Sequence, residues 1–556
     1  MNTPIYNFVA RYNALRPARF HMPGHKGRGS LGCEEGDITE IPGADSLYEA
    51  DGIIAESEAN ASRLFGCPTF YSTEGSSHCI RAMLQLAMQL QSVGGGVHDA
   101  PNVSVFGSCG TSRTPSPTKN GGRFCILAAR NVHKTFLSAA ALLDLDVVWL
   151  PSAGGSYLSA QPSPAGLDAA LTESGAAAVY LTCPDYLGFL PDLRPLAELC
   201  HAHGALLLVD NAHGAYLRFL TPSRHPMDLG ADLCCDSAHK TLPVLTGGAY
   251  LHVAERLAGA AKTSPACRGE EPAARPVEGV RPHKATGFEM QHEAVRDALA
   301  LFGSTSPSYL ILQSLDLANP YLETLPETLA AFLPKVEALK TRLRAAGWRL
   351  VGDEPLKLTL SLAAANPSPA CRGGEPAVTP VDKTSPACRG GGSAARPVEG
   401  SRPSLRFPSG TALASALAQT GIYCEFFDAD YLVCMLSPEN SEEELARLEA
   451  AFSELAAGYG RTLCAPTDST SSVIRLAGDG GCHLPLKGKA TVCSLRDAML
   501  APAVTIPAAE SLGQVLARPG VSCPPAVPIL MPGERIDAAA VSAFARYGIE
   551  YVSVLP

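Results

Sequence analysis

The sequence lacks the long hydrophobic runs and the positive charge that several classes of protein require. No stretch of about 18 uncharged apolar residues occurs in the 556-residue chain, so we expect no membrane span. The formal net charge of −10 does not suggest a nucleic-acid partner. The first residues, 1–5, show neither the basic nor the apolar part of an export signal, so we expect a cytoplasmic protein.

Common ligand-binding signatures are also missing. Neither a Walker loop nor a dinucleotide-binding fingerprint occurs. The 18 cysteines are scattered without the rhythm of a disulfide framework, which indicates reduced thiols. His21 and His25 are separated by Pro23 and Gly24, which prevent a regular helix, so we expect no metal site there.

Short apolar runs alternate with helical stretches between about residues 123 and 255. The pattern predicts a helix at 192–203 and buried strands at 124–129, 147–150, 178–182 and 206–210. Strand, helix and strand in this rhythm are typical of an α/β fold, with a mainly parallel sheet between two helical layers. Ligands bind such sheets at the carboxyl ends of the strands, which is where Asp210 stands.

The pattern changes from about residue 325. Apolar residues recur at helical spacing, and Pro334 is expected to kink or restart that helix. Strands are predicted at 356–362 and 431–436, and a capping box at Ser441 opens another helix. We predict four parts: an N-terminal segment 1–30, a large domain 31–320, a small α+β domain 321–465 and a C-terminal domain 466–556.

Two segments of the chain are near copies of each other. Residues 262–282 and 383–403 match at 17 of 21 positions, and a partial copy begins at Ser368. Their Pro, Gly and Arg content has no apolar periodicity, which predicts surface-loop insertions that do not order themselves. We place these insertions at about 262–282 and 366–403, and interpret the polar stretch at about 92–121 in the same way.

The residues that carry chemistry lie in two segments, 206–213 and 236–242. Lys240 stands beside Ser237 and His239, downstream of the strand that ends at Asp210. Pyridoxal 5'-phosphate requires such a set: a lysine amine for the Schiff base, small polar groups for the phosphate, and a carboxylate for the pyridine nitrogen. We assign the Schiff base to Lys240 and the pyridine nitrogen to Asp210. A surface lysine and an acid that caps a turn are the alternatives.

Three further positions fit the same cofactor. Ser76 and Ser77 precede a predicted helix at 79–90, where hydroxyls and backbone N–H groups form an anion site. His133 follows a strand and could stack on the pyridine ring, and His213 could contact the cofactor's phenolic oxygen or the substrate carboxylate. An ordinary helix cap, a polar strand end and a capping histidine are the respective alternatives.

Taken in order, these segments resemble the Orn/Lys/Arg decarboxylases, pyridoxal-phosphate enzymes of the aspartate-aminotransferase fold type. The matching stretches include HMPGHKGR (21–28), STEGSSHCIRAM (72–83), ARNVHKTF (129–136), VDNAHGAY (209–216), DSAHKTLPVLTGGAYLH (236–252), GIYCEFFDADYLV (421–433) and PPAVPILMPGERI (524–536). The resemblance implies a three-layer αβα large domain that binds the cofactor, followed by smaller α+β C-terminal domains. Because no receiver-like domain precedes the motifs, the chain looks like the shorter branch of the family.

The resemblance also implies an activity, the decarboxylation of arginine, lysine or ornithine to an amine and carbon dioxide, as in polyamine biosynthesis. It implies catalytic roles for Lys240, Asp210 and His213, and an active site at the interface of a homodimer or higher homo-oligomer, where residues 304–308 reach the partner's cofactor. Glu425 is the candidate for the cationic end of the substrate. The residues implied around the cofactor are Ser76, Ser77, His133, Asp210, Ser237, His239 and Lys240.

The sequence departs from the family pattern at two points. Glu74-Gly75 replaces the usual Asn-Gly of the phosphate loop, and an acid there is unfavourable unless it points away from the phosphate. Asn211 stands where an acid is more usual. Two other readings therefore remain open: another pyridoxal-phosphate reaction such as transamination, and a non-catalytic relative.

Overall fold

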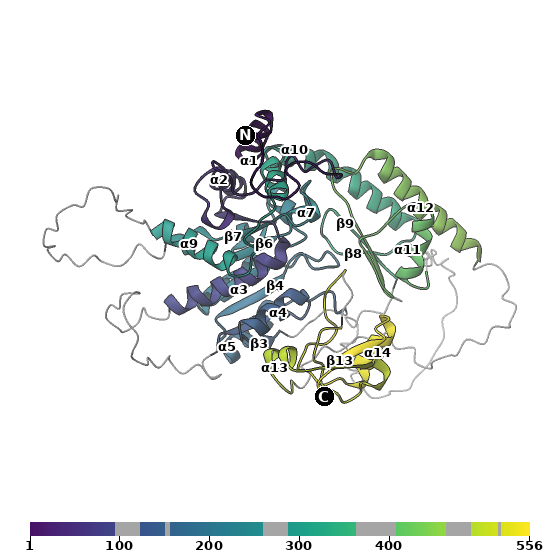
Figure 1. Cartoon of the computed structure of the whole chain (residues 1–556). Helices are drawn as coiled ribbons and strands as arrows, with labels where there is room; N and C mark the ends of the chain where they lie inside the picture. Colours follow the sequence, from purple (N-terminus) through teal and green to yellow (C-terminus); the bar gives the residue numbers. More distant parts are fainter. Residues whose placement is uncertain (95–122, 151–155, 260–286, 363–406, 463–490, 521–523) are drawn as a thin grey trace, which may run out of the picture.

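The computed structural model describes residues 1–94, 123–150, 156–259, 287–362, 407–462, 491–520 and 524–556 (Figure 1). The insertions predicted at 262–282 and 366–403 lie outside the described residues. Most of the insertion predicted at 92–121 also lies outside the described residues. Residues 92–94 are described, and they end a helix instead of belonging to an insertion. None of the described helices combines the length and the apolar character that a membrane crossing requires.

Seven strands of the described chain form one sheet in the order β1-β7-β6-β5-β4-β2-β3. Strand β7 is antiparallel to both of its neighbours, and the other pairs are parallel. The predicted strands at 178–182 and 206–210 are observed with those bounds; the one predicted at 124–129 is one residue shorter at each end, and the one at 147–150 is shifted by one residue. The strands are β1 (Thr69–Ser72), β2 (Cys125–Ala128), β3 (Asp146–Trp149), β4 (Ala178–Thr182), β5 (Leu206–Asp210), β6 (Leu233–Asp236) and β7 (Ala249–Val253).

Helices cover both faces of this sheet, so the predicted α/β architecture is confirmed. Alternate residues of β4 show the two layers: Tyr180 packs in one apolar cluster with α3, α4 and α9, and Val179 packs in another with α5 and α6. A third cluster joins α1, α2 and α10 to the β1 and β7 edge. These helices are α1 (Pro4–Ala14), α2 (Ile53–Phe65), α3 (Gly75–Gly94), α4 (Lys134–Leu142), α5 (Pro164–Ser174), α6 (Leu193–Ala202), α7 (Ala238–Thr241), α8 (Glu255–Gly259), α9 (Gly287–Ala300) and α10 (Tyr309–Ala345).

Helix α10 joins the large sheet to a smaller one. It is continuous for 37 residues through three prolines, so the chain does not restart at Pro334 as predicted. Each proline removes one backbone hydrogen bond, but buried side chains on both sides of Pro334, such as Phe332 and Val336, hold the helix in place. The boundary predicted between residues 320 and 321 falls inside this helix.

The smaller sheet is antiparallel, in the order β10-β11-β9-β8, and packs with α11 and α12. The predicted capping box is present at the start of α12: Ser441 Oγ accepts from the Glu444 N–H, and Glu444 accepts from the Ser441 N–H. The elements are β8 (Leu350–Val351), β9 (Lys357–Ser361), β10 (Phe426–Phe427), β11 (Tyr431–Met435), α11 (Gly410–Gln419) and α12 (Glu442–Thr462).

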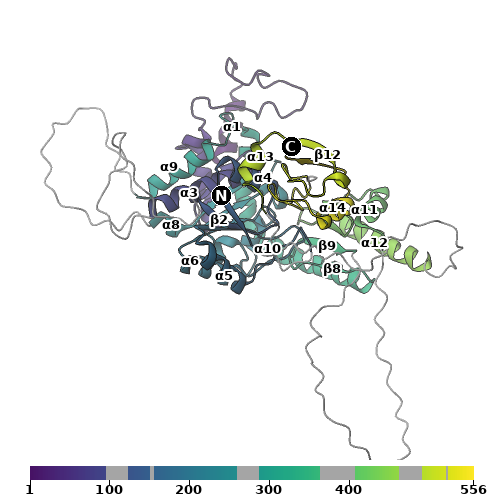
Figure 2. The same ribbon diagram turned by 90° about the horizontal axis from the view of Figure 1, so that it is seen from below.

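The C-terminal part packs against the carboxyl edge of the large sheet, and Figure 2 shows α13 beside α4. The Lys134 N–H donates to the Ala526 carbonyl at 2.8 Å, and the Arg130 guanidinium makes a buried bidentate ion pair with Glu534. These contacts place residues 524–527 near the end of β2. The elements here are α13 (Leu495–Leu500), β12 (Val504–Pro507), α14 (Ala538–Arg546) and β13 (Tyr551–Val554).

Candidate active site

A cavity of about 240 Å³ lies at the carboxyl edge of the large sheet. Strand β5 ends there at Asp210, and β6 ends at Asp236, one residue before Ser237. All nine residues proposed from the sequence line this one cavity: Ser76, Ser77, His133, Asp210, His213, Ser237, His239, Lys240 and Glu425. Such edges are the usual ligand-binding positions of α/β sheets.

Lys240 reaches the cavity from the short helix α7. Its Nζ lies 3.0 Å from Nε2 of His213, which comes from the loop after β5. Burial, reinforced by the positive charge of Lys240, holds the pKa of His213 well below its ordinary value. The imidazole is therefore neutral and accepts a hydrogen bond from the lysine, which directs the amine.

Asp210 is a buried acid whose hydrogen-bond donors are neutral. Its carboxylate accepts from the Tyr180 hydroxyl at 3.2 Å and from the Ala212 N–H at 3.1 Å. Burial raises the pKa of Asp210, and the positive charge of Lys240 offsets part of that rise. A buried carboxylate in this position gains stability from a cation that enters the cavity.

His133 caps the N-terminus of α4 with its ring at the cavity. Nδ1 accepts from the Thr135 N–H at 3.2 Å, so the single proton of the neutral ring is on Nε2. Burial, followed by the charges of Lys240, Lys134 and Arg81, lowers the pKa of His133 to about 4. At neutral pH the ring is therefore uncharged and can stack on an aromatic ligand.

The part of the cavity formed by the N-terminus of α3 suits an anion. Helix α3 starts at Gly75, so Ser76 and Ser77 lie in its first turn and not ahead of it, as the predicted start at 79 implied. The backbone N–H groups of a first turn have no intrahelical acceptors, and the helix dipole favours negative charge there. The two hydroxyls are fixed by neighbours: Ser237 donates to Ser76 at 2.7 Å, and Thr135 donates to Ser77 at 3.1 Å.

Glu74, the unusual acid of this loop, is directed elsewhere. Its Oε1 accepts from the Ser304 N–H at 2.6 Å, and Glu74 is not among the residues that line the cavity. His239 is oriented in turn by the Gly248 carbonyl, which lies 3.0 Å from its Nδ1. The Glu74 carboxylate is therefore held by Ser304 and does not enter the cavity beside Ser76 and Ser77.

Glu425 lines the same cavity from the segment before β10. Its Oε1 accepts from the Tyr186 hydroxyl at 3.1 Å, and the Tyr186 ring makes an edge contact with His213 at 5.2 Å between centroids. A carboxylate in this place can pair with a cationic ligand group. Tyr186 therefore contacts both Glu425 and His213, and His213 in turn contacts Lys240.

Sequence reasoning missed several lining residues, notably Asn131, Tyr186 and the segment 524–527. The side-chain Nδ2 and Oδ1 of Asn131 and the Nδ1 of His213 are buried without a hydrogen-bond partner among the described residues. Buried polar atoms that line a cavity and lack partners indicate a ligand that supplies them. One signal for Asn131 was available, because it follows a predicted strand by two residues.

Comparison with known proteins agrees with this geometry. Residues 110–345 match the family model described as Orn/Lys/Arg decarboxylase, major domain. Arginine decarboxylases of Halalkalibacterium halodurans and Bacillus subtilis are each 25% identical to the chain, over 96% and 97% of its length and 91% and 92% of theirs. These matches support a relationship of the chain to the Orn/Lys/Arg decarboxylase family.

Solved structures support the fold described above. The Escherichia coli constitutive lysine decarboxylase matches all of the chain and 82% of its own, with a TM-score of 0.65 and 15% identity. Lysine decarboxylase A of Pseudomonas aeruginosa matches all of the chain and 80% of its own, with a TM-score of 0.66 and 15% identity. At such identity the likeness establishes the architecture alone.

Proposed function

We propose that this chain binds pyridoxal 5'-phosphate in the cavity and decarboxylates a basic amino acid, arginine, lysine or ornithine, to the amine and carbon dioxide. One observation carries the proposal: Lys240, Asp210 and His133 meet the N-terminus of α3 around a single cavity. The match to the family model and two relatives named arginine decarboxylase, aligned over nearly their full length, support the reaction and the substrate class.

The residues present fit the cofactor. Lys240 would bind the aldehyde, His133 would cover the ring, and the first turn of α3 with Ser237 would hold the phosphate. The unpartnered atoms of Asn131 and His213 are available for the ring substituents. When bound, pyridoxal phosphate supplies an electron sink for the electron pair released by bond cleavage.

The chain's own groups control two protons. Asp210 would hold a proton on the pyridine nitrogen, because a cation beside it offsets the burial that raises the pKa of this carboxyl. His213 accepts a hydrogen bond from Nζ of Lys240 and so keeps the amine aimed at the cavity. Neither role requires a charged histidine, which agrees with the lowered pKa of His213.

Glu425, an acid that lines the cavity, indicates the class of substrate. Glu425, fixed by the Tyr186 hydroxyl, would take the ammonium or guanidinium end of the substrate. A hydrogen bond to a charged group contributes about 1.5–3 kcal/mol, so Glu425→Gln should weaken binding of a basic substrate about 10- to 100-fold. Norleucine, whose side chain carries no charge, should bind equally well to Glu425→Gln and to the wild type.

The test is a substrate panel with product identification. Purified protein loaded with pyridoxal phosphate is incubated separately with arginine, lysine and ornithine, and both amine and carbon dioxide are measured. Amine with an equal amount of carbon dioxide is the expected result for at least one substrate. A keto acid would instead indicate transamination, and no product from any of the three would indicate a non-catalytic relative.

We extend the proposal to a cytoplasmic homodimer, or a larger homo-oligomer, with the site at the interface. Apolar side chains in the first 31 residues are strongly exposed in the single chain, among them Leu15 (80%), Phe20 (96%) and Leu31 (85%). The cysteines of the described residues are free thiols, which suits a reducing compartment. Sedimentation velocity tests the assembly, and a monomer at micromolar concentration would contradict it.

A further inference from the structure

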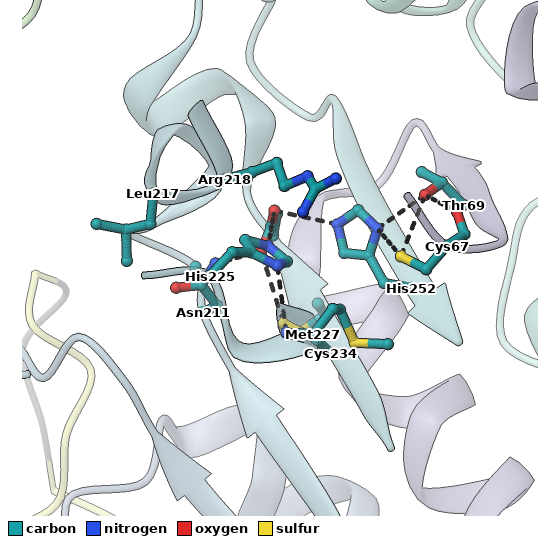
Figure 3. Close-up of polar contacts among 12 residues, drawn as sticks. Cys67, Thr69, Asn211, Leu217, Arg218, His225, Met227, Cys234 and His252 are labelled. Atoms are coloured by element: carbon teal, nitrogen blue, oxygen red, sulfur yellow. Dashed lines mark hydrogen bonds and ion pairs between the residues drawn. The ribbon is translucent and has the colours of Figure 1, made fainter. Parts of the chain in front are cut away.

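A buried cluster of charged and polar side chains lies behind the cavity. The Asp236 carboxylate, at the end of β6, is 3.0 Å from Nε2 of His225 and 3.0 Å from Nε2 of His252, and it accepts from Asn211 Nδ2 at 2.7 Å. All four side chains have an exposed fraction of 0%. Figure 3 shows the rings of His225 and His252 close together, with Cys67 and Thr69 on the far side of His252.

The protons of His225 can be assigned from its partners. Its Nδ1 faces the Met227 N–H at 3.3 Å, and a backbone N–H can only donate, so this ring nitrogen is the acceptor. The proton is therefore on Nε2, which donates to Asp236. His225 is a neutral imidazole with both nitrogens satisfied.

His252 differs because both of its ring nitrogens face acceptors. Its Nδ1 is 2.9 Å from Thr69 Oγ1, whose single hydroxyl proton is directed to the Cys67 carbonyl at 3.0 Å. The Cys67 sulfur, 3.9 Å away, is a weak acceptor on the same side. Thr69 Oγ1 therefore accepts from Nδ1, and Nε2 carries a second proton toward the Asp236 carboxylate.

We propose that His252 is a buried imidazolium paired with Asp236, and that this pair is a positioning device for the cofactor site, where it allows Asp210 to stay ionised. Asp210 and Asp236 end neighbouring parallel strands, so the negative charge of Asp236 acts on Asp210. Without a counter-charge beside it, the Asp236 carboxylate raises the pKa of Asp210 and so favours protonation of Asp210. The positive charge on His252 cancels that of Asp236. The part of the proposal that concerns Asp210 rests on the proposed function.

The pKa directions agree with the hydrogen-bond geometry. Burial alone would raise the pKa of Asp236, but His225 and His252 hold it well below the ordinary value, and the neutral His225 of our assignment contributes to this through its hydrogen bond. Burial alone would lower the pKa of His252, but the Asp236 carboxylate raises it above the ordinary value. The remaining groups that face the His252 ring are Cys67, His225 and the aromatic rings of Phe65 and Tyr250.

A metal ion is the competing explanation for this cluster. His225, Cys234 and Asp236 offer ligand atoms that all lie within 4.8 Å of one another. Ligation through Nε2 of His225 would move its proton to Nδ1 and break the bond from Met227. The geometry therefore favours protons between these side chains, and metal analysis of the purified protein separates the two cases.

The first experiment reads the protonation directly. The full chain is labelled with ¹⁵N-histidine, and ring ¹H–¹⁵N correlations are recorded near pH 8 with and without pyridoxal phosphate, with assignment by His252→Gln and His225→Gln. We expect two N–H signals from His252, at imidazolium ¹⁵N shifts, and one from His225. A single N–H signal from His252, or a stoichiometric metal ion in the protein, would overturn the proposal.

The second experiment reads the effect on Asp210. Affinity is measured for pyridoxal phosphate and for its analogue with C–H in place of the ring nitrogen, which cannot pair with Asp210. His252→Gln should weaken binding of pyridoxal phosphate by about tenfold or more relative to the analogue, the effect of roughly one pKa unit or more at Asp210. His225→Gln, equally buried but neutral in our assignment, should leave this ratio unchanged. Equal weakening of both ligands by His252→Gln would reduce the cluster to a structural role and refute the positioning claim.

A milder variant guards against misfolding. Thr69→Val keeps the shape of the side chain but removes the acceptor of the Nδ1 proton, whereas Thr69→Ser retains it. We expect loss of the Nδ1–H signal in the valine variant and its recovery in the serine variant. Neither experiment needs turnover, so a negative substrate panel and a negative result here are distinguishable.

Discussion

Burial sets the charge of the ionisable side chains around the cavity. It keeps His133 and His213 neutral and raises the pKa of Asp210, which then favours a cationic partner. The cavity therefore combines the uncharged rings of His133 and His213 with the amine of Lys240. It also contains the Asp210 carboxylate, which a protonated ring nitrogen would stabilise. These charges suit a pyridinium ligand with an anionic tail.

The carboxylate of Asp210 can be tested by an isosteric change. Asp210→Asn keeps the shape of the side chain and one oxygen, which can accept from either Tyr180 or Ala212, but loses the negative charge. We expect kcat to fall about 100-fold or more, with a smaller change in KM, because the proton on the ring nitrogen is no longer held. Steady-state kinetics with the best substrate measures this.

Asp316 on α10 offers the control for that variant. It is also a buried acid, with a pKa raised by burial to about 6, and it accepts from Ser57 and the Tyr6 N–H outside the cavity. Asp316→Asn should leave kcat within about twofold. A similar kcat in the two variants would argue against a role for Asp210 at the cofactor.

His133 predicts a specific pH dependence of stability. The pKa of His133 is about 4 in the folded chain and ordinarily 6.5, as expected in the unfolded chain, so between these values the unfolded chain binds a proton that the folded chain does not. The folded state therefore loses stability as the pH falls through this window, by about 2 kcal/mol at about pH 5. Urea unfolding of the cofactor-free protein should show that His133→Gln loses less stability than the wild type between about pH 7.5 and 5. Equal losses would show that His133 does not titrate in this way.

Among the elements, the N-terminus of α3 forms the anion end of the cavity. Gly75 starts this helix with φ of +73°, and a Cβ there would meet no atom within 4 Å, so Gly75→Ala adds backbone strain without a clash. The strain costs about 1–2 kcal/mol. We expect weaker binding of pyridoxal phosphate in addition, measured by titration with the cofactor.

Gly175, which ends α5, is the matched control for that change. It has φ of +60° and equally open space around a Cβ, but it lies away from the cavity. Gly175→Ala should cost a similar amount of stability and leave cofactor affinity unchanged. If both variants bind the cofactor like the wild type, the first turn of α3 does not hold the phosphate.

Elements with strong local signals were predictable from the sequence, and elements fixed by distant packing were not. The apolar runs 178–182 and 206–210 became β4 and β5 with those bounds, because their residues are buried on both faces. The antiparallel insertion of β7 between β1 and β6 has no local signature, since it depends on pairing across 180 residues of chain. Likewise α10 continues through its prolines because its buried face packs on other elements.

The residues of the candidate site divide in the same way into those predictable from local sequence and those placed by distant packing. The residues beside Lys240 and Asp210 lie in short motifs at strand ends, where chemistry and position coincide. Asn131, Tyr186 and segment 524–527 reach the cavity only because separate parts of the chain converge on it. The direction of the Glu74 side chain also depends on a distant group, the Ser304 N–H.

At the scale of the whole molecule, the C-terminal part closes one side of the cavity through Pro524, Pro525 and Val527. The buried ion pair of Arg130 and Glu534 fixes this part to the end of β2, with hydrogen bonds of 2.7 and 2.8 Å. Arg130 directly precedes Asn131 in the cavity wall. We therefore expect packing of the C-terminal part and cofactor binding to be coupled.

A double-mutant cycle tests this coupling. Arg130→Met or Glu534→Leu alone leaves one buried charge without its partner and should cost about 3–5 kcal/mol of unfolding free energy, together with cofactor affinity. The double variant should recover most of both losses, because no buried charge remains. Arg342→Met, which breaks an exposed pair with Glu449, should change neither quantity measurably. Additive losses in the double variant would contradict the coupling.

The central claim is a covalent bond between Nζ of Lys240 and the aldehyde of pyridoxal phosphate. Reduction of the loaded protein with borohydride, followed by digestion and mass spectrometry, locates that bond. We predict one modified peptide, which contains Lys240 and is absent from Lys240→Ala. Modification at another lysine, such as the buried Lys357, or no modified peptide at all, would contradict the account.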